Sequence, residues 1–279
     1  MTGDIELSQP ITIQGDNGAA VSVTINMNGK KLTDKTSVGQ TTAGCIFIVP
    51  SGSTLNLSNG SIADVSNITG NNTKYIAGAI VNDGTATLSS VTISGCKGLL
   101  GGAIKNNQGA KLNLNTCTFD SNEARTKDGF DSGNGGGIWN GSGSKLSIQG
   151  ANTVTDNNGL DNADNVFLTN GIVIAVTGSL AGSQIGVSMA TPDVFTSGFG
   201  ANNDKEPLTY FLSDDSDYKI VASDKEAKLV KDMETGIETM SDVRGQMSDV
   251  WYDLNGRRLE MKPATKGVYI NNGCKVVIK

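Results

Sequence analysis

The sequence predicts an all-β fold, in which successive turns of the chain stack as coils of a solenoid and a small C-terminal β module follows. A four-residue motif recurs four times, and its final isoleucines are 34, 24 and 34 residues apart. Self-similarity at this period indicates stacked repeats. Short runs of alternating apolar residues follow each copy, and glycine and asparagine punctuate them, which is typical of strands and turns. The four copies are Ala43-Gly44-Cys45-Ile46, Ala77-Gly78-Ala79-Ile80, Gly101-Gly102-Ala103-Ile104 and Gly135-Gly136-Gly137-Ile138.

Residues 1–42 are expected to form the N-terminal end of the solenoid. The segments 11–13 and 21–25 alternate apolar and polar residues, and Asn28-Gly29 is a turn signal. A solenoid requires an atypical first unit, because its first coil otherwise leaves the core uncovered.

Residues 43–160 are the recognisable repeats, within a solenoid of seven to nine coils. Equal spacing inside each copy predicts that Ile46, Ile80, Ile104 and Ile138 form one internal column. The two long spacings predict inserted loops at residues 63–76 and 123–134. Insertions in repeat proteins collect on loops of one face. We therefore expect both to project from the same side.

Asparagine follows the motif isoleucine by two residues in three copies, at Asn82, Asn106 and Asn140. In stacked coils these amides would lie one above another. A ladder of stacked amides donates and accepts along the axis, whereas a functional interpretation would be a row that binds sugars. We favour the structural ladder.

Three segments complete the chain and set the predicted domain boundaries. Residues 165–230 keep short apolar runs but lose the motif, so residues 1–230 are expected to end in final coils, a cap and a polar loop at 198–207. Residues 231–249 are polar and irregular, which indicates a linker. Residues 250–279 contain strand-like runs separated by turn signals at 255–256 and 271–273, which predicts a small β module.

Composition excludes several classes of function. The net charge is −6 and the sequence has no basic stripe with interleaved aromatics, so nucleic-acid binding is not expected. No apolar run reaches the roughly 18 residues of a membrane span. Histidine is absent, which removes imidazole catalysis and most zinc sites. Nothing indicates assembly, so we expect a monomer.

The four cysteines are Cys45, Cys96, Cys117 and Cys274. No pair has CxxC spacing, so neither a redox nor a zinc motif is indicated. Small buried thiols are favoured over a disulfide, which stays an alternative. Cys45 is expected at the motif position that Ala79 fills in the second copy.

The repeats resemble a known family. The GGAI-like motifs, with Phe119-Asp120-Ser121-Asn122 after the third copy, are similar to the GGAI and FxxN signatures of polymorphic outer-membrane protein repeats. The resemblance covers residues 43–158. It implies a right-handed parallel β-helix of the pectin-lyase-like type. Only one FxxN is complete, and no autotransporter barrel follows.

The C-terminal tail resembles a different family. Its segments 251–258, 266–270 and 275–279 look like the C-terminal sorting module of the type IX secretion pathway in Gram-negative bacteria, although they are shorter. The resemblance implies a bacterial protein that is secreted or held at the outer membrane or cell surface. The sequence begins without a signal segment, which is compatible with a cytosolic protein or with a mature secreted form. The resemblance of the tail favours the mature form.

Catalytic and metal-binding candidates lie in loops near the repeat ends. β-Helix lyases use calcium-binding carboxylates and a basic residue, and glycosidases use paired carboxylates. The candidate acids are Asp120, Asp128, Asp131, Asp156, Asp161 and Asp164, and the candidate bases are Arg125 and Lys127. Residues 156–165 are rich in oxygen ligands but match no known calcium loop. Solvated polar loops are favoured, and a calcium site is kept as an alternative; no other cofactor is indicated.

Aromatic residues near the two insertions are the best binding candidates. Tyr75, Phe130 and Trp139 lie in or beside the inserted loops, together with the acidic Asp128 and Asp131. Trp139 directly follows the inward-facing Ile138, so strand alternation points it outward. We expect a secreted or surface-attached, adhesin-like protein that binds a host glycan or surface protein without catalysis. The alternative is a polysaccharide lyase or glycoside hydrolase.

Overall fold

The computed structural model describes residues 1–34, 44–66, 77–125, 133–160, 162–232, 251–254, 256–259, 261–271 and 274–278. Backbone contacts divide the chain into two compact units, Met1–Asp232 and Met233–Lys279. No helix in these described ranges is long and apolar enough to cross a bilayer.

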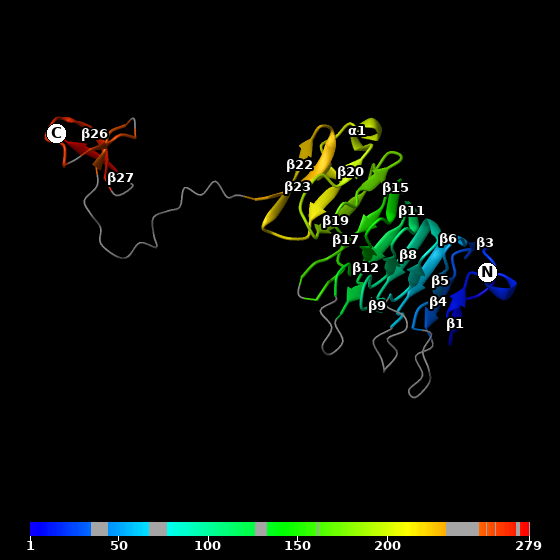
Figure 1. Cartoon of the computed structure of the whole chain (residues 1–279). Helices are drawn as coiled ribbons and strands as arrows, with labels where there is room; N and C mark the ends of the chain where they lie inside the picture. The colour runs from blue at the N-terminus through cyan, green and yellow to red at the C-terminus, as the bar shows by residue number, and fades with distance from the viewer. Residues whose placement is uncertain are drawn as a thin grey trace. The chain divides into compact units, whose positions relative to one another are not determined.

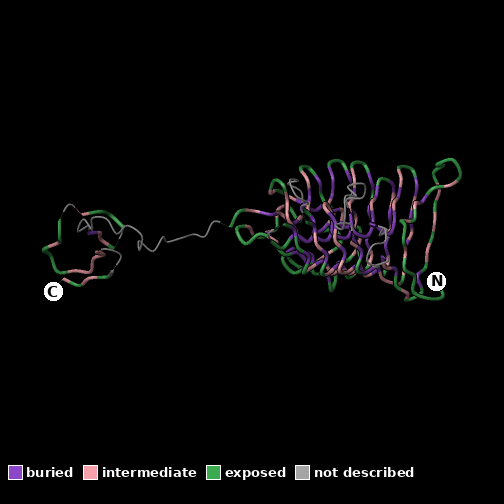
Figure 2. The backbone as a smooth tube through the Cα atoms, turned by 90° about the horizontal axis from the view of Figure 1, so that it is seen from below, coloured by how far each residue is buried: buried purple, intermediate pink, exposed green. Residues whose placement is uncertain are grey.

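The first unit is a parallel β-solenoid of about six turns (Figure 1). This is fewer than the seven to nine coils expected, because part of residues 165–230 forms an antiparallel hairpin and short helices in place of further coils. Buried residues lie inside the stack and exposed ones at its corners (Figure 2).

Each coil contributes to three parallel sheets. The first sheet contains β2 (Ile11–Thr12), β5 (Phe47–Val49), β7 (Ile80–Asn82), β10 (Ile104–Asn106), β14 (Ile138–Asn140), β17 (Val166–Leu168) and the end of β19 (Gln184–Met189). The second contains β3 (Ser22–Asn26), the first halves of β6 (Thr54–Ala63) and β8 (Thr85–Ser94), β11 (Lys111–Asn115), β15 (Lys145–Gln149), β18 (Ile174–Val176) and β20 (Thr196–Ser197). The third contains β1 (Ile5–Leu7), β4 (Lys31–Asp34), the second halves of β6 and β8, β12 (Thr118–Asp120), β16 (Thr153–Val154), the start of β19 and β21 (Phe211–Ser213).

Short elements occupy the corners and the ends. β9 (Lys97–Gly98) pairs with β13 (Glu123–Ala124). η1 (Asp16–Gly18) lies in the first coil, and α1 (Phe199–Asn202) and η2 (Pro207–Thr209) lie near the last. The hairpin of β22 (Tyr218–Ser223) and β23 (Glu226–Lys231) ends the unit.

The predicted internal column exists, but its first member is wrong. Ile80, Ile104 and Ile138 are register neighbours, whereas the partner of Ile80 in the preceding coil is Phe47. Ile46 instead takes the register position of Ala79. Cys45, which was expected at that position, therefore lies one residue before it. The amides of Ile46 and Phe47 both donate to the Ala79 carbonyl, at 2.9 and 3.0 Å. Ile46 and Phe47 are both fully buried, so apolar character alone could not establish the register.

The second and third sheets each contain a further apolar column. Leu57, Leu88, Leu114 and Ile148 are register neighbours in the second sheet, as are Ile62, Ile93, Phe119 and Val154 in the third. Between these two sheets the chain bends at residues with positive φ in successive coils, which are Asn59, Ser90, Thr116 and Gly150. A left-handed backbone conformation at the same point of each coil keeps the coils in register. Only glycine or a residue with a short polar side chain adopts this conformation at low cost.

The asparagine ladder is confirmed as a structural feature. The Asn82 amide donates to the Asn106 side-chain oxygen at 2.9 Å, and the Asn106 amide donates to that of Asn140 at 3.1 Å. All three residues are fully buried. The stack therefore satisfies buried polar groups within the core, and no sugar reaches it.

The polar loop expected at residues 198–207 is partly a packed cap. Phe199, at the start of α1, is buried and lies edge-to-face with Tyr210, with ring centroids 5.8 Å apart. Phe195 and Phe211 pack in the same way at 5.2 Å. Aromatic side chains thus close this end of the core, where the motif is lost.

Three of the cysteines are free and buried, at Cys45, Cys96 and Cys117. Burial raises the pKa of the Cys45 and Cys96 thiols to about 12. The small-thiol interpretation is confirmed for these three; the side chain of Cys274 lies outside the described part.

The second unit is a small antiparallel sheet. β24 (Trp251–Tyr252) pairs with β25 (Arg258–Leu259) and with β26 (Gly267–Asn271), which pairs with β27 (Cys274–Ile278). Trp251 is buried in it. Residues 233–250, most of the expected linker, lie outside the described ranges.

Candidate functional site

The outward side of the first sheet carries a row of half-buried side chains that we name the outer row. Strand alternation places these residues between the inward-facing ones, and parallel register stacks them along the axis. The outer row consists of Ile48, Val81, Lys105, Trp139, Phe167 and Ser188.

The outer row presents two aromatic rings on adjacent coils. Trp139 and Phe167 are register neighbours, and the Lys105 ammonium lies 5.4 Å from the Trp139 ring centroid. Burial lowers the pKa of Lys105, and the charge of Asp83 opposes that shift. A cation over a ring face is a favourable arrangement that orients both side chains.

A groove of about 680 Å³ continues the outer row, and we name it the Phe167 groove. Phe167 and Ser188 belong to both features, and Gly133 and Asn134 bring the end of the second insertion to its edge. The groove is lined by Gly133, Asn134, Gly159, Leu160, Asn162, Ala163, Asp164, Phe167, Ser188, Asp214, Asp215 and Ser216. Its wall combines apolar surface with amide, hydroxyl and carboxylate groups, a combination that is typical of small-ligand sites.

A second asparagine ladder positions one of the groove's carboxylates. The Asn122 amide donates to Asn157 at 2.8 Å, Asn157 donates to Asn165 at 2.9 Å, and Asn165 donates to Asp214 at 2.6 Å. Asn122 is the last residue of the FxxN segment. The ladder therefore runs along a corner of the solenoid and ends on a carboxylate in the groove.

Asp164 and Asp214, two of the three carboxylates that line the groove, have raised pKa values. Burial raises the pKa of Asp214 to about 6, and the neighbouring charge of Asp164 adds to this, while hydrogen bonds from Asn165 oppose it. Burial also raises the pKa of Asp164, against hydrogen bonds from Ser188 and the Gly135 amide. Two such acids in one groove are the arrangement most like a glycosidase pair in the described residues.

Their hydrogen bonds nevertheless give these acids a structural role. Asp164 accepts from the Gly135 amide at 2.7 Å through one oxygen and from the Ser188 hydroxyl through the other. Asp214 accepts from the Asn165 amide and side chain, one through each oxygen, both at 2.6 Å. All four oxygens therefore accept hydrogen bonds from groups of the fold itself, which gives both side chains a structural role.

The oxygen-rich loop at residues 156–165 also uses side-chain oxygens for hydrogen bonds within the fold. The side-chain oxygens of Asn157 and Asn165 accept from backbone and side-chain amides. Within the described ranges, no group of three or more Asp, Glu, Cys or His side chains is arranged to hold a metal. Asp161 lies outside these ranges.

Four of the five residues predicted to bind a ligand fall in segments outside the described part of the chain. Tyr75, Phe130, Asp128 and Asp131 lie outside the described residues, as does the candidate base Lys127. Trp139 is half-buried on the outer side of its strand, as alternation predicted. Arg125, the other candidate base, pairs with Glu123.

Sequence reasoning missed Phe167 and Asp214. A signal for Phe167 was present, because Val166-Phe167-Leu168 repeats the in-out-in pattern of Ile138-Trp139-Asn140. Asp214 had no comparable signal, since its partner Asn165 is 49 residues away.

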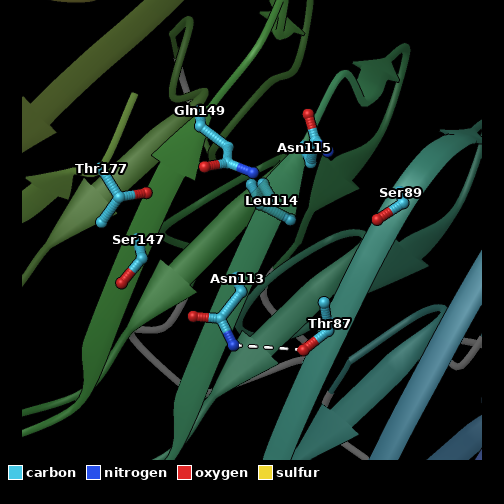
Figure 3. A pocket seen from close by; sticks show the side chains of 8 residues that line it. All are labelled: Thr87, Ser89, Asn113, Leu114, Asn115, Ser147, Gln149 and Thr177. Atoms are coloured by element: carbon cyan, nitrogen blue, oxygen red, sulfur yellow. Dashed lines mark hydrogen bonds between the residues drawn. The ribbon is translucent and has the colours of Figure 1, made fainter. Parts of the chain in front are cut away.

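The outward side of the second sheet is a different kind of surface, which we name the polar face. Its residues are small and mostly uncharged, and the Asn113 amide donates to the Thr87 hydroxyl at 3.2 Å (Figure 3). A shallow hollow of about 270 Å³ crosses it. The hollow is lined by Thr87, Ser89, Asn113, Leu114, Asn115, Ser147, Gln149 and Thr177. It offers hydrogen bonds but no aromatic ring.

No family model matches this chain, and no curated protein or solved structure shows significant similarity to it.

Proposed function

We propose that this protein is a non-catalytic, adhesin-like binding protein, secreted or held at a bacterial cell surface, that binds a host glycan along the outer row and in the Phe167 groove. The observation that carries the proposal is the pair of adjacent aromatic residues, Trp139 and Phe167, that leads into a groove lined by amides, hydroxyls and carboxylates.

The shape and chemistry of the outer row suit an extended sugar chain. Aromatic rings supply flat apolar area for the apolar face of a sugar ring, and neighbouring polar groups bond its hydroxyls. Adjacent coils rise by about 4.8 Å. A linear chain can therefore contact several coils at once, which is an advantage of a solenoid surface.

The hydrogen bonds of Asp164 and Asp214 support binding over catalysis. A lyase or hydrolase requires an acid or base that is free to exchange a proton with the substrate. The raised pKa values of Asp214 and Asp164 in one groove favour the alternative, a carbohydrate-active enzyme. Two resemblances support a location at the cell surface. The repeats resemble those of polymorphic outer-membrane proteins, and the tail resembles a type IX sorting module.

A glycan array with the purified full-length chain tests the proposal, together with immobilised extracellular-matrix proteins as the alternative partners. Glycans that bind would then be titrated against Trp139→Ala and Phe167→Ala. We expect each substitution to weaken binding about tenfold or more, because aromatic side chains dominate interface energies. The matched control is Asn113→Ala with Gln149→Ala, which alters the polar face of neighbouring coils.

Three results would contradict the proposal. If the control loses affinity and the aromatic variants keep it, the ligand binds the polar face. If a bound glycan is cleaved, and cleavage stops in both Asp164→Asn and Asp214→Asn, the protein is an enzyme. Binding to a matrix protein with no glycan bound would overturn the ligand class.

A further inference from the structure

Residues 251–279, which include the C-terminal sheet, and the rest of the chain have net charges of opposite sign. Residues 251–279 contain six cationic side chains and two acidic ones, Asp253 and Glu260, for a net charge of +4. The whole chain has a net charge of −6, so residues 1–250 carry −10. An anionic partner would thus be attracted to residues 251–279 and repelled by the remainder.

Three of the six cations, Arg257, Arg258 and Lys262, line one groove, which we name the basic groove. It has a volume of about 630 Å³ and is lined by Arg257, Arg258, Leu259, Met261, Lys262, Pro263, Ala264, Thr265 and Tyr269. None of these lining residues is acidic. Arg257 lies 3.9 Å from the Asp253 carboxylate but is 82 % exposed, and Arg258 and Lys262 are also exposed.

Apolar side chains stand in solvent beside these cations. Met261, in the wall of the basic groove, is 76 % exposed, and Leu254, in the turn before Arg257, is 63 % exposed. Lys262 lies over the Trp251 ring, with its ammonium 5.7 Å from the ring centroid. A soluble polyanion would match the cations alone. The boundary of a bilayer matches both kinds of side chain, because cations meet the headgroups while apolar side chains enter between the acyl chains.

We propose that the basic groove is a docking site for an anionic lipid surface, and that it attaches the chain peripherally to a membrane. The headgroup phosphates contact Arg257, Arg258 and Lys262, and Met261 enters the interfacial layer. The negative charge of residues 1–250 disfavours contact of that part with the same surface. This proposal is independent of the glycan site.

The test uses the full chain and lipid vesicles. The chain has two tryptophans, so Trp139→Phe leaves Trp251 as the fluorescent reporter beside Lys262. We expect binding to phosphatidylcholine vesicles that contain about 30 % phosphatidylglycerol, no binding to pure phosphatidylcholine, and a fall in affinity with added salt. Replacing Arg257, Arg258 and Lys262 together by Gln is expected to weaken binding about a hundredfold.

Matched variants make the outcome decisive. Lys31→Gln, Lys205→Gln and Lys225→Gln together remove the same charge from exposed sites of the solenoid and are expected to leave vesicle binding unchanged. Met261→Asn is expected to weaken vesicle binding severalfold without affecting binding of heparin, a soluble polyanion.

Three results would overturn the proposal. The first is absence of binding to anionic vesicles by the full chain. The second is an equal loss in the groove variant and in the solenoid control, which would show an effect of net charge only. The third is heparin binding as tight as vesicle binding, with no effect of Met261→Asn on either, which would identify a site for soluble polyanions.

Discussion

The outer row and the polar face lie on two sheets of the same coils, yet they present different chemistry. Behind both, the inner side chains form continuous apolar columns with the same parallel register. Outside, one sheet carries Trp139 and Phe167 beside a groove, and the other carries small hydroxyls and amides. The difference shows that stacking constrains the inward residues, whereas the outward ones are free to specify a ligand.

A charge placed inside should cost far more than the same charge placed outside. We expect Ile104→Asp to lower the free energy of unfolding by about 4 kcal/mol, because it puts a carboxylate into a dry apolar column without a partner. Asn113→Asp, on the polar face one strand later, should change it by less than about 0.5 kcal/mol. Urea unfolding measures both. Equal effects would contradict the division between inner and outer positions.

The buried ladders should be the next most sensitive feature. Asn122→Ala leaves the Cys96 amide without its acceptor and the Ile93 carbonyl without its donor. We expect a loss of about 3 kcal/mol, since buried polar groups lose their partners. Asn113→Ala removes a surface amide bond for comparison and should cost about 0.5 kcal/mol. A loss below about 1 kcal/mol for Asn122→Ala would show that water replaces the ladder.

The Phe167 groove should make stability depend on pH in a way that the polar face cannot. An unfolded aspartate has a pKa of about 3.9, and in the fold the pKa of Asp214 is about 6. The fold therefore favours the protonated form. The stability that protonated Asp214 contributes is complete below pH 4 and is lost as the pH rises through 6. The raised pKa of Asp164 acts in the same direction. We expect the unfolding free energy to fall by about 3 kcal/mol from this source.

Comparison of Asp214→Asn with the wild type isolates that contribution. Unfolding free energies at pH 4 and pH 7.5 should differ less in Asp214→Asn, whereas Asp204→Asn, at an exposed site, should keep the wild-type difference. An unchanged difference in Asp214→Asn would assign the pH dependence to other groups.

The buried thiols provide the mildest test, because the thiol reagent is applied to the folded protein and leaves the fold intact. In a Cys274→Ser variant we expect no reaction of Cys45, Cys96 or Cys117 with Ellman's reagent at pH 8, since burial raises the pKa of each thiol and excludes the reagent. Three thiols should react after unfolding in guanidinium chloride. Rapid reaction of the folded protein would show that the coils open locally.

The sequence by itself determined the interior of the solenoid. Alternation identified the inward columns and the outward position of Trp139, and the recurrence of Asn82, Asn106 and Asn140 predicted their ladder. These features follow from local period and equal spacing, which the chain carries in every copy. The insertions that hold Tyr75 and Phe130 remain a prediction.

Only the tertiary structure decided which distant residues meet. It placed Phe47 against Ile80 in the stack, because two consecutive buried residues leave the register open to one-residue shifts. It also brought Asp214 to Asn165 and joined Phe167 to a groove. Where coils differ in length and the motif is lost, the pairing depends on packing of the whole stack, which no local pattern encodes.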